Sequence, residues 1–266
     1  MIRRALLLTA ISLTAAPPLY WWRVDEGASS ERSNFGDELS RVIVERLVGA
    51  SIERADRDDS GKLLAIGSIL QFAQNGDIVW GSGINGKHPD PSDYHFDSLD
   101  VRAVRGPLTA RFLADHFGIE TDISFGDPAL LLPTLFPEFH PEPKRDYIVI
   151  PNINPMEMSR VTHLPESILP TEPWETIIRA ITESRFVISS SLHGIVVAEA
   201  FGIPARFLRL TQHEPDCKYT DYYLATGREG FTPAHSIEEA LELGGEPPPD
   251  IDIYPLSESF PFDAFE

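Results

Sequence analysis

The sequence of 266 residues is poor in cysteine, in lysine and in basic charge overall. Its single cysteine, Cys217, excludes an internal disulfide framework and suits a reducing compartment. The 22 basic residues are outnumbered by 41 acidic ones, which leaves a formal net charge of -19. Because nucleic acids and anionic membranes bind basic surfaces, this balance argues against both as partners.

Only four of the basic residues are lysines, and the other eighteen are arginines. The lysines are Lys62, Lys87, Lys144 and Lys218. Guanidinium groups form paired hydrogen bonds with carboxylates and phosphates. An acidic protein of this composition can therefore still bind an anion, in a pocket that gathers arginine locally. The eight histidines show no spacing typical of metal ligands, so no metal site is predicted.

No segment is both long and apolar enough to predict a transmembrane helix. The first 17 residues have the outline of a short signal peptide, with Arg3 and Arg4 before an apolar stretch and small residues up to Pro17. We favour a simpler interpretation, a non-structural extension or a start codon placed upstream, because a core strand is already predicted from Leu19.

Short apolar runs alternate with amphipathic stretches along the rest of the chain. Such alternation is typical of an α/β fold with parallel strands. It predicts two Rossmann-like halves that face each other across a cleft. Strands are predicted at residues 19–22, 63–68, 77–83, 101–106, 147–150, 186–188 and 205–210, and helices at 38–49, 107–118, 173–180, 192–202 and 236–244.

Prolines mark the boundary between the two halves. Four of them stand between residues 133 and 143, which predicts a linker there. The final segment is rich in proline and acidic residues and is expected to lie along the surface. The predicted divisions are an N-terminal extension or signal-like segment (1–17), an N-terminal α/β domain (18–133), the linker (134–145), a C-terminal α/β domain (146–245) and the tail (246–266).

The most informative segment is the corner that follows the strand at 186–188. Three serines at 189–191 precede Leu192, His193 and Gly194, and a helix follows. In parallel α/β sheets, ligands collect at the carboxyl ends of strands, where helix N-termini attract anions. A histidine placed there can bind an anion and move a proton near neutral pH. We therefore predict a catalytic role for His193, although a lone histidine is more often structural.

A second candidate stands at a loop-to-helix junction. Asn34, Gly36 and Asp37 occupy this junction, where Asn and Asp commonly cap the backbone N–H groups of a helix. Alternatively, Asp37 faces the cleft as an acid, a base or a group that orients a hydroxyl.

Three further motifs lie at predicted strand ends or turns. Gly81, Ser82 and Gly83 follow a strand, and the glycines either form a tight exit or let a ligand approach the backbone. Arg105 lies just before a predicted helix and would point at the same cleft rim, unless it is merely solvated. Asp127 precedes a proline and is more often a turn former than a catalyst.

Together these motifs resemble the polysaccharide pyruvyl transferase family. The likeness spans residues 19–210 and the ending at 260–263, and the exopolysaccharide ketal-pyruvate transferases look most similar. It implies a fold similar to that of the two-domain GT-B glycosyltransferases. The ordered set is Asn-Phe-Gly-Asp at 34–37, Trp-Gly-Ser-Gly-Ile at 80–84, Val-Arg-Gly-Pro-Leu-Thr at 104–109, Gly-Asp-Pro-Ala at 126–129 and Ser-Leu-His-Gly at 191–194.

The resemblance implies an enzyme of exopolysaccharide biosynthesis. Such an enzyme would take pyruvate from phosphoenolpyruvate and attach it as a cyclic ketal across two hydroxyls of a glycan sugar. Asp37 would be the acid–base group near the acceptor, and His193 would hold the phosphate or carboxylate of the donor. By the same resemblance, the donor would contact Arg105, Ser191, Leu192 and Gly194, and the cleft would be lined by Asn34, Gly36, Gly81, Ser82, Gly83 and Asp127.

The resemblance also implies partners and a compartment. Phosphoenolpyruvate would be a substrate, and no cofactor is expected. The acceptor would be a glycan or a lipid-linked oligosaccharide. We expect a cytoplasmic protein with at most peripheral association with the inner face of the membrane, and secretion through residues 1–17 stays open as an alternative.

One position departs from the pattern of the family. Many members carry an arginine immediately before the Leu-His pair, and here that position is Ser191. A serine donates one hydrogen bond and carries no charge, so Arg105, Arg206 or Arg209 would have to compensate. Two alternatives therefore stay open. One is a GT-B-type glycosyltransferase that uses a nucleotide sugar, and the other is a non-catalytic relative that binds glycans.

Overall fold

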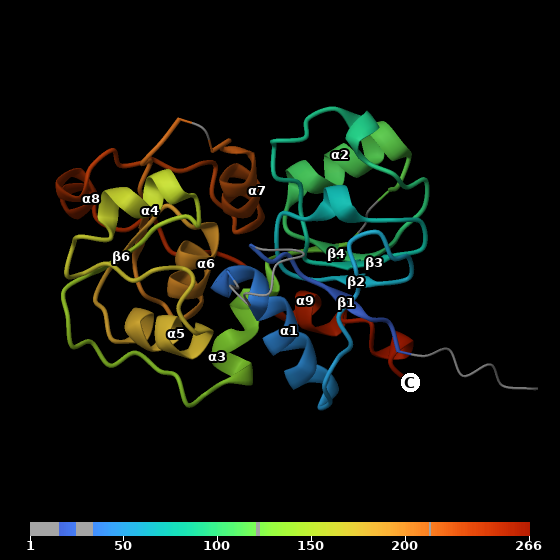
Figure 1. Cartoon of the computed structure of the whole chain (residues 1–266), viewed down its shortest axis with the longest axis horizontal. Coiled ribbons are helices and arrows are strands. Elements are labelled where there is room, and N and C mark those ends of the chain that lie inside the picture. Colours follow the sequence, from blue (N-terminus) through green and yellow to red (C-terminus); the bar gives the residue numbers. More distant parts are fainter. Residues whose placement is uncertain (1–15, 25–33, 121–122, 213) are drawn as a thin grey trace, which may run out of the picture.

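The chain folds into two parallel β-sheets with helices between and around them (Figure 1). The computed structural model describes residues 16–24, 34–120, 123–212 and 214–266. The first sheet contains, in chain order, β1 (Leu19–Tyr20), β2 (Leu63–Leu64), β3 (Ile78–Trp80), β4 (Asp100–Val104) and β5 (Ser124–Phe125). The second contains β6 (Ile148–Ile150), β7 (Val187–Ser189) and β8 (Ala205–Phe207).

This architecture confirms the predicted α/β class with parallel sheets, whereas the likeness to GT-B enzymes and the domain boundaries stay predictions. The helices are α1 (Phe35–Val48), α2 (Pro107–Phe117), α3 (Leu132–Leu135), α4 (Pro155–Val161), α5 (Trp174–Thr182), α6 (Leu192–Ala200), α7 (Cys217–Ala225), α8 (Ile237–Leu243) and α9 (Tyr254–Glu258). Of these, α3, α4, α7 and α9 were not predicted, nor was strand β5. Part of the predicted linker packs firmly, because Phe136 and Phe139 both lie edge-on to Trp174 of α5.

Alternating side chains place the first sheet between two apolar layers. Leu63 and Ile78 belong to the largest buried cluster, while their chain neighbours Leu64 and Val79 belong to a second cluster with Leu113 of α2. Successive residues of a strand point to opposite faces, so each two- or three-residue strand contributes to both layers. Helix α2 therefore covers one face of this sheet.

The second sheet is built in the same way. Ile148 and Ile150 face the largest cluster, and Val149 between them packs with Val161 of α4 and Ala240 of α8. The outer layer of this sheet is thus formed by α4 and α8, at the left of Figure 1. The inner face packs on α5 and α6, whose apolar residues belong to the same largest cluster.

Helix α6 is the central element of this cluster. Every residue from Leu192 to Glu199 is buried, which fits a helix that is apolar on all sides. It packs on β7, β8 and α5, and also on the 3₁₀ turn at Pro128–Leu131 that follows the first sheet. Helix α1 contacts both this turn and α5. The apolar core is therefore continuous from one sheet to the other.

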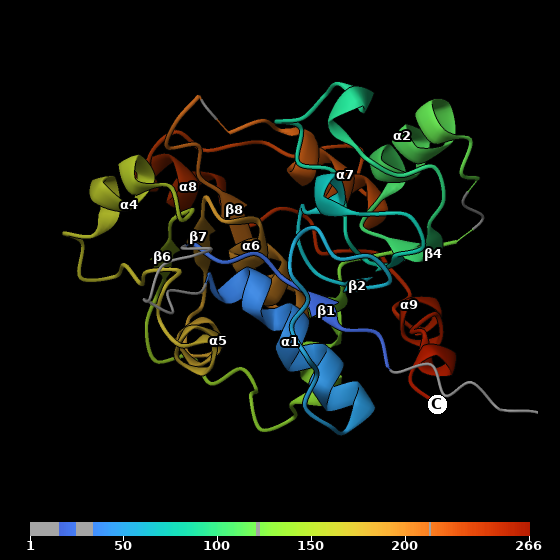
Figure 2. The same ribbon diagram turned by 45° about the vertical axis from the view of Figure 1, so that its right-hand side comes forward.

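The C-terminal tail is more deeply packed than its composition predicts. Leu256 in α9 and Phe260 are buried, and the indole Nε1 of Trp80 donates a hydrogen bond to the carbonyl of Leu256 at 2.9 Å. Arg102 holds Asp263 through an ion pair of 2.8 Å. Figures 1 and 2 show α9 beside the first sheet, so the chain returns at its end to the N-terminal half. These contacts anchor a tail that lies along the surface as expected, because most of residues 246–266 are exposed or half-buried.

Candidate functional site

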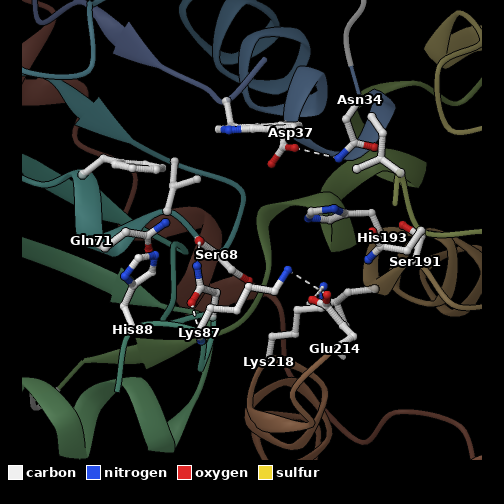
Figure 3. A pocket seen from close by; sticks show the side chains of 17 residues that line it. Asn34, Asp37, Ser68, Gln71, Lys87, His88, Ser191, His193, Glu214 and Lys218 are labelled. Carbon is white, nitrogen blue, oxygen red and sulfur yellow. Dashed lines mark hydrogen bonds and ion pairs between the residues drawn. The ribbon is translucent and has the colours of Figure 1, made fainter. Parts of the chain in front are cut away.

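A cavity of ≈ 290 Å³ opens where the strands of both sheets end (Figure 3). Its lining comes from the segments that follow β1, β2, β3, β6, β7 and β8, together with the start of α1. Ligands of parallel α/β proteins bind at these carboxyl ends of strands. The lining residues are Trp22, Asn34, Asp37, Ser68, Ile69, Gln71, Phe72, Asn85, Lys87, His88, Asn152, Ile153, Ser191, Leu192, His193, Glu214 and Lys218.

Asp37 reaches the cavity from the first turn of α1. Asn34, the residue before the helix, makes no side-chain cap; its Nδ2 instead donates to Oδ2 of Asp37 at 2.6 Å. Burial raises the pKa of Asp37 above its usual value, and the charge of His193 and the bond from Asn34 offset part of that rise. The carboxyl therefore has an increased proton affinity, which suits a group that exchanges a proton with a ligand.

His193 lies opposite Asp37, at the second residue of α6. Its Nε2 is 3.5 Å from Oδ2 of Asp127, and neither atom has a hydrogen-bond partner among the described residues. The other oxygen of Asp127 accepts a bond of 2.9 Å from the backbone N–H of Ala129, which fixes the carboxylate beside the imidazole. Asp127 therefore lies beside His193 on the side of Nε2 and can orient the imidazole.

Gly36 is required by this same contact. A side-chain Cβ at position 36 would overlap the imidazole of His193, so only glycine allows α1 to lie against the ring. The motif around Gly36 thus positions two functional groups at once. It presents Asp37 to the cavity and leaves space for the histidine from the other half of the chain.

Three charged side chains form a wall of the cavity away from Asp37. Glu214 accepts from Lys218 at 2.5 Å and from Lys87 at 2.8 Å. Burial acts to raise the pKa of Glu214, but the two lysines outweigh it, so the pKa lies below its usual value. Burial lowers the pKa of Lys218, and Glu214 offsets part of that effect. Two ammonium groups share one carboxylate, which gives this wall a net positive charge.

The start of α6 provides a second place for an anion. Ser191 precedes the helix and its side chain makes no capping bond, so its hydroxyl can donate to a ligand in the cavity. The N-terminus of a helix carries a partial positive charge and unpaired N–H groups. Figure 3 shows Ser191 and His193 across the cavity from Gln71 and His88, with Lys218 and Glu214 below them.

Arg105 does not line this cavity, which corrects the expectation that it contacts the donor. Its guanidinium is buried and bonds to Asp221 of α7 at 2.9 Å, to the hydroxyl of Ser68 at 2.6 Å and to the carbonyl of Ile84 at 2.5 Å. Asp221 in turn accepts the N–H of Leu108 at the start of α2. Arg105 therefore joins α7 to the first sheet and holds Ser68 in place.

The two other arginines considered as replacements are also absent from the lining. Arg206 is buried and bonds to Glu246 and to the carbonyls of Gly244 and Thr232. Arg209 pairs with Asp216 at 2.6 Å. The positive charge of the cavity is thus supplied by lysines.

Several residues expected to line the cleft or to contact the donor have packing roles instead. Gly81 has a φ of 94° and lies against Pro128, and Gly83 lies against the guanidinium of Arg105. The Ser82 hydroxyl donates to the carbonyl of Ala65 at 2.9 Å. None of the three lines the cavity.

Gly194 likewise does not line the cavity. Its role is to let α6 pack closely on the second sheet. A Cβ there would overlap the side chain of Ser189 at the end of β7. Of the predicted site residues, the structure brings together in the lining Asn34, Asp37, Ser191, Leu192 and His193.

The sequence interpretation missed the charged wall. Lys87 and Glu214 come from loops and Lys218 from the first turn of α7, and none of these segments carries a recognisable motif. Asn152 and His88 are similar cases. One signal was present, because the chain has only four lysines and two of them line this cavity. Because lysine is rare in this chain, the positions at which it does occur are informative.

Two kinds of feature, a metal-binding cluster and a membrane-spanning helix, are absent from the described residues. Within residues 16–24, 34–120, 123–212 and 214–266, no group of His, Cys, Asp and Glu side chains is arranged to hold a metal ion. None of the helices in these ranges combines the length and apolar character that crossing a bilayer requires.

Comparison with known proteins agrees with the motifs. Residues 34–211 match the polysaccharide pyruvyl transferase family. The succinoglycan biosynthesis protein ExoV of Rhizobium meliloti (strain 1021) is 28% identical over 244 residues, which cover 85% of this chain and 71% of that protein. The uncharacterized protein L143 of Acanthamoeba polyphaga mimivirus is 26% identical over 212 residues, with coverages of 74% and 72%.

Among solved structures, an uncharacterized protein of Klebsiella pneumoniae subsp. pneumoniae NTUH-K2044 aligns with a TM-score of 0.45. Its sequence is 12% identical, and the alignment covers 82% of this chain and 93% of that one.

Proposed function

The chain belongs to the polysaccharide pyruvyl transferase family, and from that premise we propose that it transfers pyruvate from phosphoenolpyruvate to two hydroxyls of a glycan sugar as a cyclic ketal. The observation that carries the proposal is the convergence of Asp37, His193, Lys87 and Lys218 on one cavity. These side chains combine proton transfer with anion binding, and this chemistry needs both. The succinoglycan role in the name of the ExoV protein supports an exopolysaccharide acceptor.

The donor carries a phosphate and a carboxylate, so it needs at least two positive regions. We place the anionic groups between the N-terminus of α6, with the hydroxyl of Ser191, and the wall formed by Lys87 and Lys218. Two lysines beside one glutamate leave an excess positive charge for the phosphate, which one serine does not supply. In this protein the charge that an arginine would supply at position 191 would come from the opposite side of the cavity. Glu214 holds both ammonium groups close together until the donor binds.

The proposed reaction adds one proton to carbon and removes two from hydroxyls. Protonation of the methylene carbon of phosphoenolpyruvate creates a methyl group and an oxocarbenium-like centre. One acceptor hydroxyl attacks this centre, the C–O bond to phosphate breaks, and the second hydroxyl closes the ketal. Of the two hydroxyl protons, one balances the proton gained by carbon and the other leaves with the phosphate.

Asp37 and His193 divide these proton transfers. Asp37 lies in the first turn of α1 and has a raised pKa. As the general base it would accept the proton of the attacking hydroxyl. His193, supported by Asp127 at 3.5 Å, would in its charged form hold the donor and supply the proton to carbon. A positioned acid or base typically contributes about 10²–10⁴ in rate, which sets the size of the effect expected from each.

We propose further that the acceptor is a glycan or a lipid-linked oligosaccharide and that the protein acts in the cytoplasm, at most at the inner face of the membrane. No cofactor takes part in the scheme, because phosphoenolpyruvate already carries the group that is transferred. Every step uses side chains of the cavity and the two substrates.

The test is phosphate release from phosphoenolpyruvate in the presence of surface glycan from the source cells. Product glycan is examined by proton NMR for the methyl group of a pyruvate ketal. We expect release by the wild type, a loss of about 10² or more in rate for His193→Ala and Asp37→Asn, and no change for His140→Ala. His140 is exposed and outside the cavity, so it controls for the substitution itself.

Two outcomes would contradict the proposal. Absence of phosphate release by the wild type with every glycan supplied would favour the non-catalytic glycan-binding relative. Consumption of a nucleotide sugar instead would favour a glycosyltransferase. Equal rates for the wild type and both cavity variants would show that the phosphate comes from another source.

A further inference from the structure

A second cavity of ≈ 310 Å³ adjoins the one described above. The two share Gln71, Phe72 and His88, which form the boundary between them. The remaining lining belongs to the N-terminal half and is independent of the donor wall. It consists of Arg57, Asp58, Gln74, Ser92, Asp93 and His95.

The second cavity contains polar groups that the protein itself does not use. The side chains of Gln71, Gln74 and His95 make no hydrogen bond to the residues that the structure describes. The amide oxygen of Gln71, at the boundary, is buried without a partner. Because an unpaired buried polar atom is unfavourable, this amide favours a ligand that can donate to it.

The charges of the second cavity are balanced. Arg57 lies 3.4 Å from Asp58, and its guanidinium also lies over the ring of Phe72 at 5.5 Å. His88 lies 3.2 Å from Asp93. Arg57 and His88 each have an acidic neighbour, in contrast to the donor wall with two lysines for one glutamate. The second cavity therefore suits a neutral ligand rather than a phosphate.

Neutral amides and hydroxyls beside one aromatic ring are the groups that bind sugars. Hydroxyls of a sugar both donate and accept, which matches glutamine, serine and histidine. The apolar face of a pyranose can lie on the ring of Phe72, which is half-buried between the cavities. Gln74 and His95 are paired through an isolated parallel bridge, so their backbones are held at a fixed separation.

We propose that this second cavity binds the sugar adjacent to the one that receives pyruvate, and so recognises the acceptor as a chain. The inference rests on the proposed function, because it places the reacting sugar in the first cavity beside Asp37. The acceptor would cross the boundary at Gln71 and Phe72, while the donor lies on the far side against Ser191 and Lys218. Acceptor length, rather than donor binding, is then the property that this cavity controls.

The experiment compares acceptors of different length. Surface glycan is partially hydrolysed and sorted into fragments of one sugar and of three or more. We measure KM and kcat for each fragment with wild type, Gln74→Ala, His95→Ala and the control His140→Ala. Gln74 and His95 line the second cavity alone, so neither substitution touches the catalytic groups.

We expect Gln74→Ala and His95→Ala each to raise KM for the longer fragments by about three- to tenfold, the effect of one lost hydrogen bond. The KM for phosphoenolpyruvate and the KM for the single sugar should not change. Thermal denaturation of each variant shows that it is folded. An equal rise for both fragment lengths, or no rise for either, would overturn the proposal while leaving the transferase intact.

A failure of the transferase itself gives a different result. If the wild type transfers no pyruvate, the proposed function is wrong, and binding of the fragments is then followed by saturation-transfer NMR. Binding of the longer fragments that is lost in His95→Ala supports a glycan site without catalysis. Equal binding by wild type and His95→Ala rejects the site.

Discussion

Replacing Arg105 with methionine separates a structural role from a role in donor binding. The guanidinium is 1% exposed and bonds to Asp221, Ser68 and the carbonyl of Ile84. Methionine fills a similar volume but leaves the carboxylate of Asp221 without its charged partner. That carboxylate is fully buried and keeps only the neutral donors of Leu108 and Thr109.

The expected cost follows from this geometry. Removing one member of a buried ion pair destabilises a protein by about 3–5 kcal/mol, mainly because the other charge stays buried. Replacing Asp221 with asparagine in the same chain removes that charge. The amide oxygen still accepts from the start of α2, and the amide nitrogen faces the hydroxyl of Thr109. We therefore expect the double variant to recover most of the loss and to lie about 1–2 kcal/mol below the wild type.

The assay is equilibrium unfolding in urea, followed by circular dichroism. With a slope of about 3 kcal/mol per molar urea, Arg105→Met should lower the midpoint by about 1–1.7 M, and the double variant by about 0.3–0.7 M. The KM for phosphoenolpyruvate is then measured on the double variant, which is the better folded of the two. We expect it to stay within about threefold of the wild type, because the guanidinium does not line the cavity.

Two results would refute this reasoning. If the double variant is no more stable than Arg105→Met, the buried pair is not the source of the loss. If the double variant is stable but its KM for phosphoenolpyruvate rises tenfold or more, Arg105 contacts the donor after all, and its role in the family resemblance is restored.

Three further predictions concern the cavity. Burial raises the pKa of Asp37 in the folded state, so the folded protein binds that proton more tightly than the unfolded chain and loses stability as pH rises above the pKa of the unfolded chain. Asp37→Asn removes this titration, so its Tm should gain on that of the wild type as pH rises above about 4, while transfer is lost. Lys218→Met should raise the KM for phosphoenolpyruvate about tenfold or more by loss of a charged contact, whereas Lys144→Met, at an exposed lysine paired with Glu183, should not; equal values would remove Lys218 from the donor site. Gly36→Ala should push the imidazole of His193 aside and lower kcat about tenfold or more, and the control Gly230→Ala, in open space, should leave kcat unchanged.

Much of the fold follows from local patterns. The strands at β3, β6 and β7 are continuous apolar runs, and α2 begins at a proline and ends at a glycine with a φ of 64°, both readable signals. Helices α4 and α7 were missed because their apolar periodicity is weak. The anchoring of the tail was not predicted, because composition does not reveal that Leu256 and Phe260 contact Trp80.

The candidate site likewise has residues that local patterns predict and residues that they do not. Asp37 and His193 belong to motifs whose local form, a loop or strand followed at once by a helix, fixes them at strand ends, and the structure brings them to one cavity. Lys87, Glu214 and Lys218 lie in segments without such a form. Their grouping depends on how the loop after β3 of the first sheet packs against the segment after β8 of the second sheet. No local sequence pattern predicts that packing.

The sequence alone was sufficient to predict the parallel α/β class, the family, and Asp37 and His193 as candidates for proton transfer. Which cations line the cavity depends on tertiary contacts. Arg105 is held away from the cavity by Asp221, 116 residues later, while Lys87 and Lys218 both pair with Glu214. The function of a charged side chain depends on the partner beside it, and these partners come from distant parts of the chain. The position of His193 at the start of α6 is set by the residues next to it in the sequence, so it could be predicted from the sequence alone.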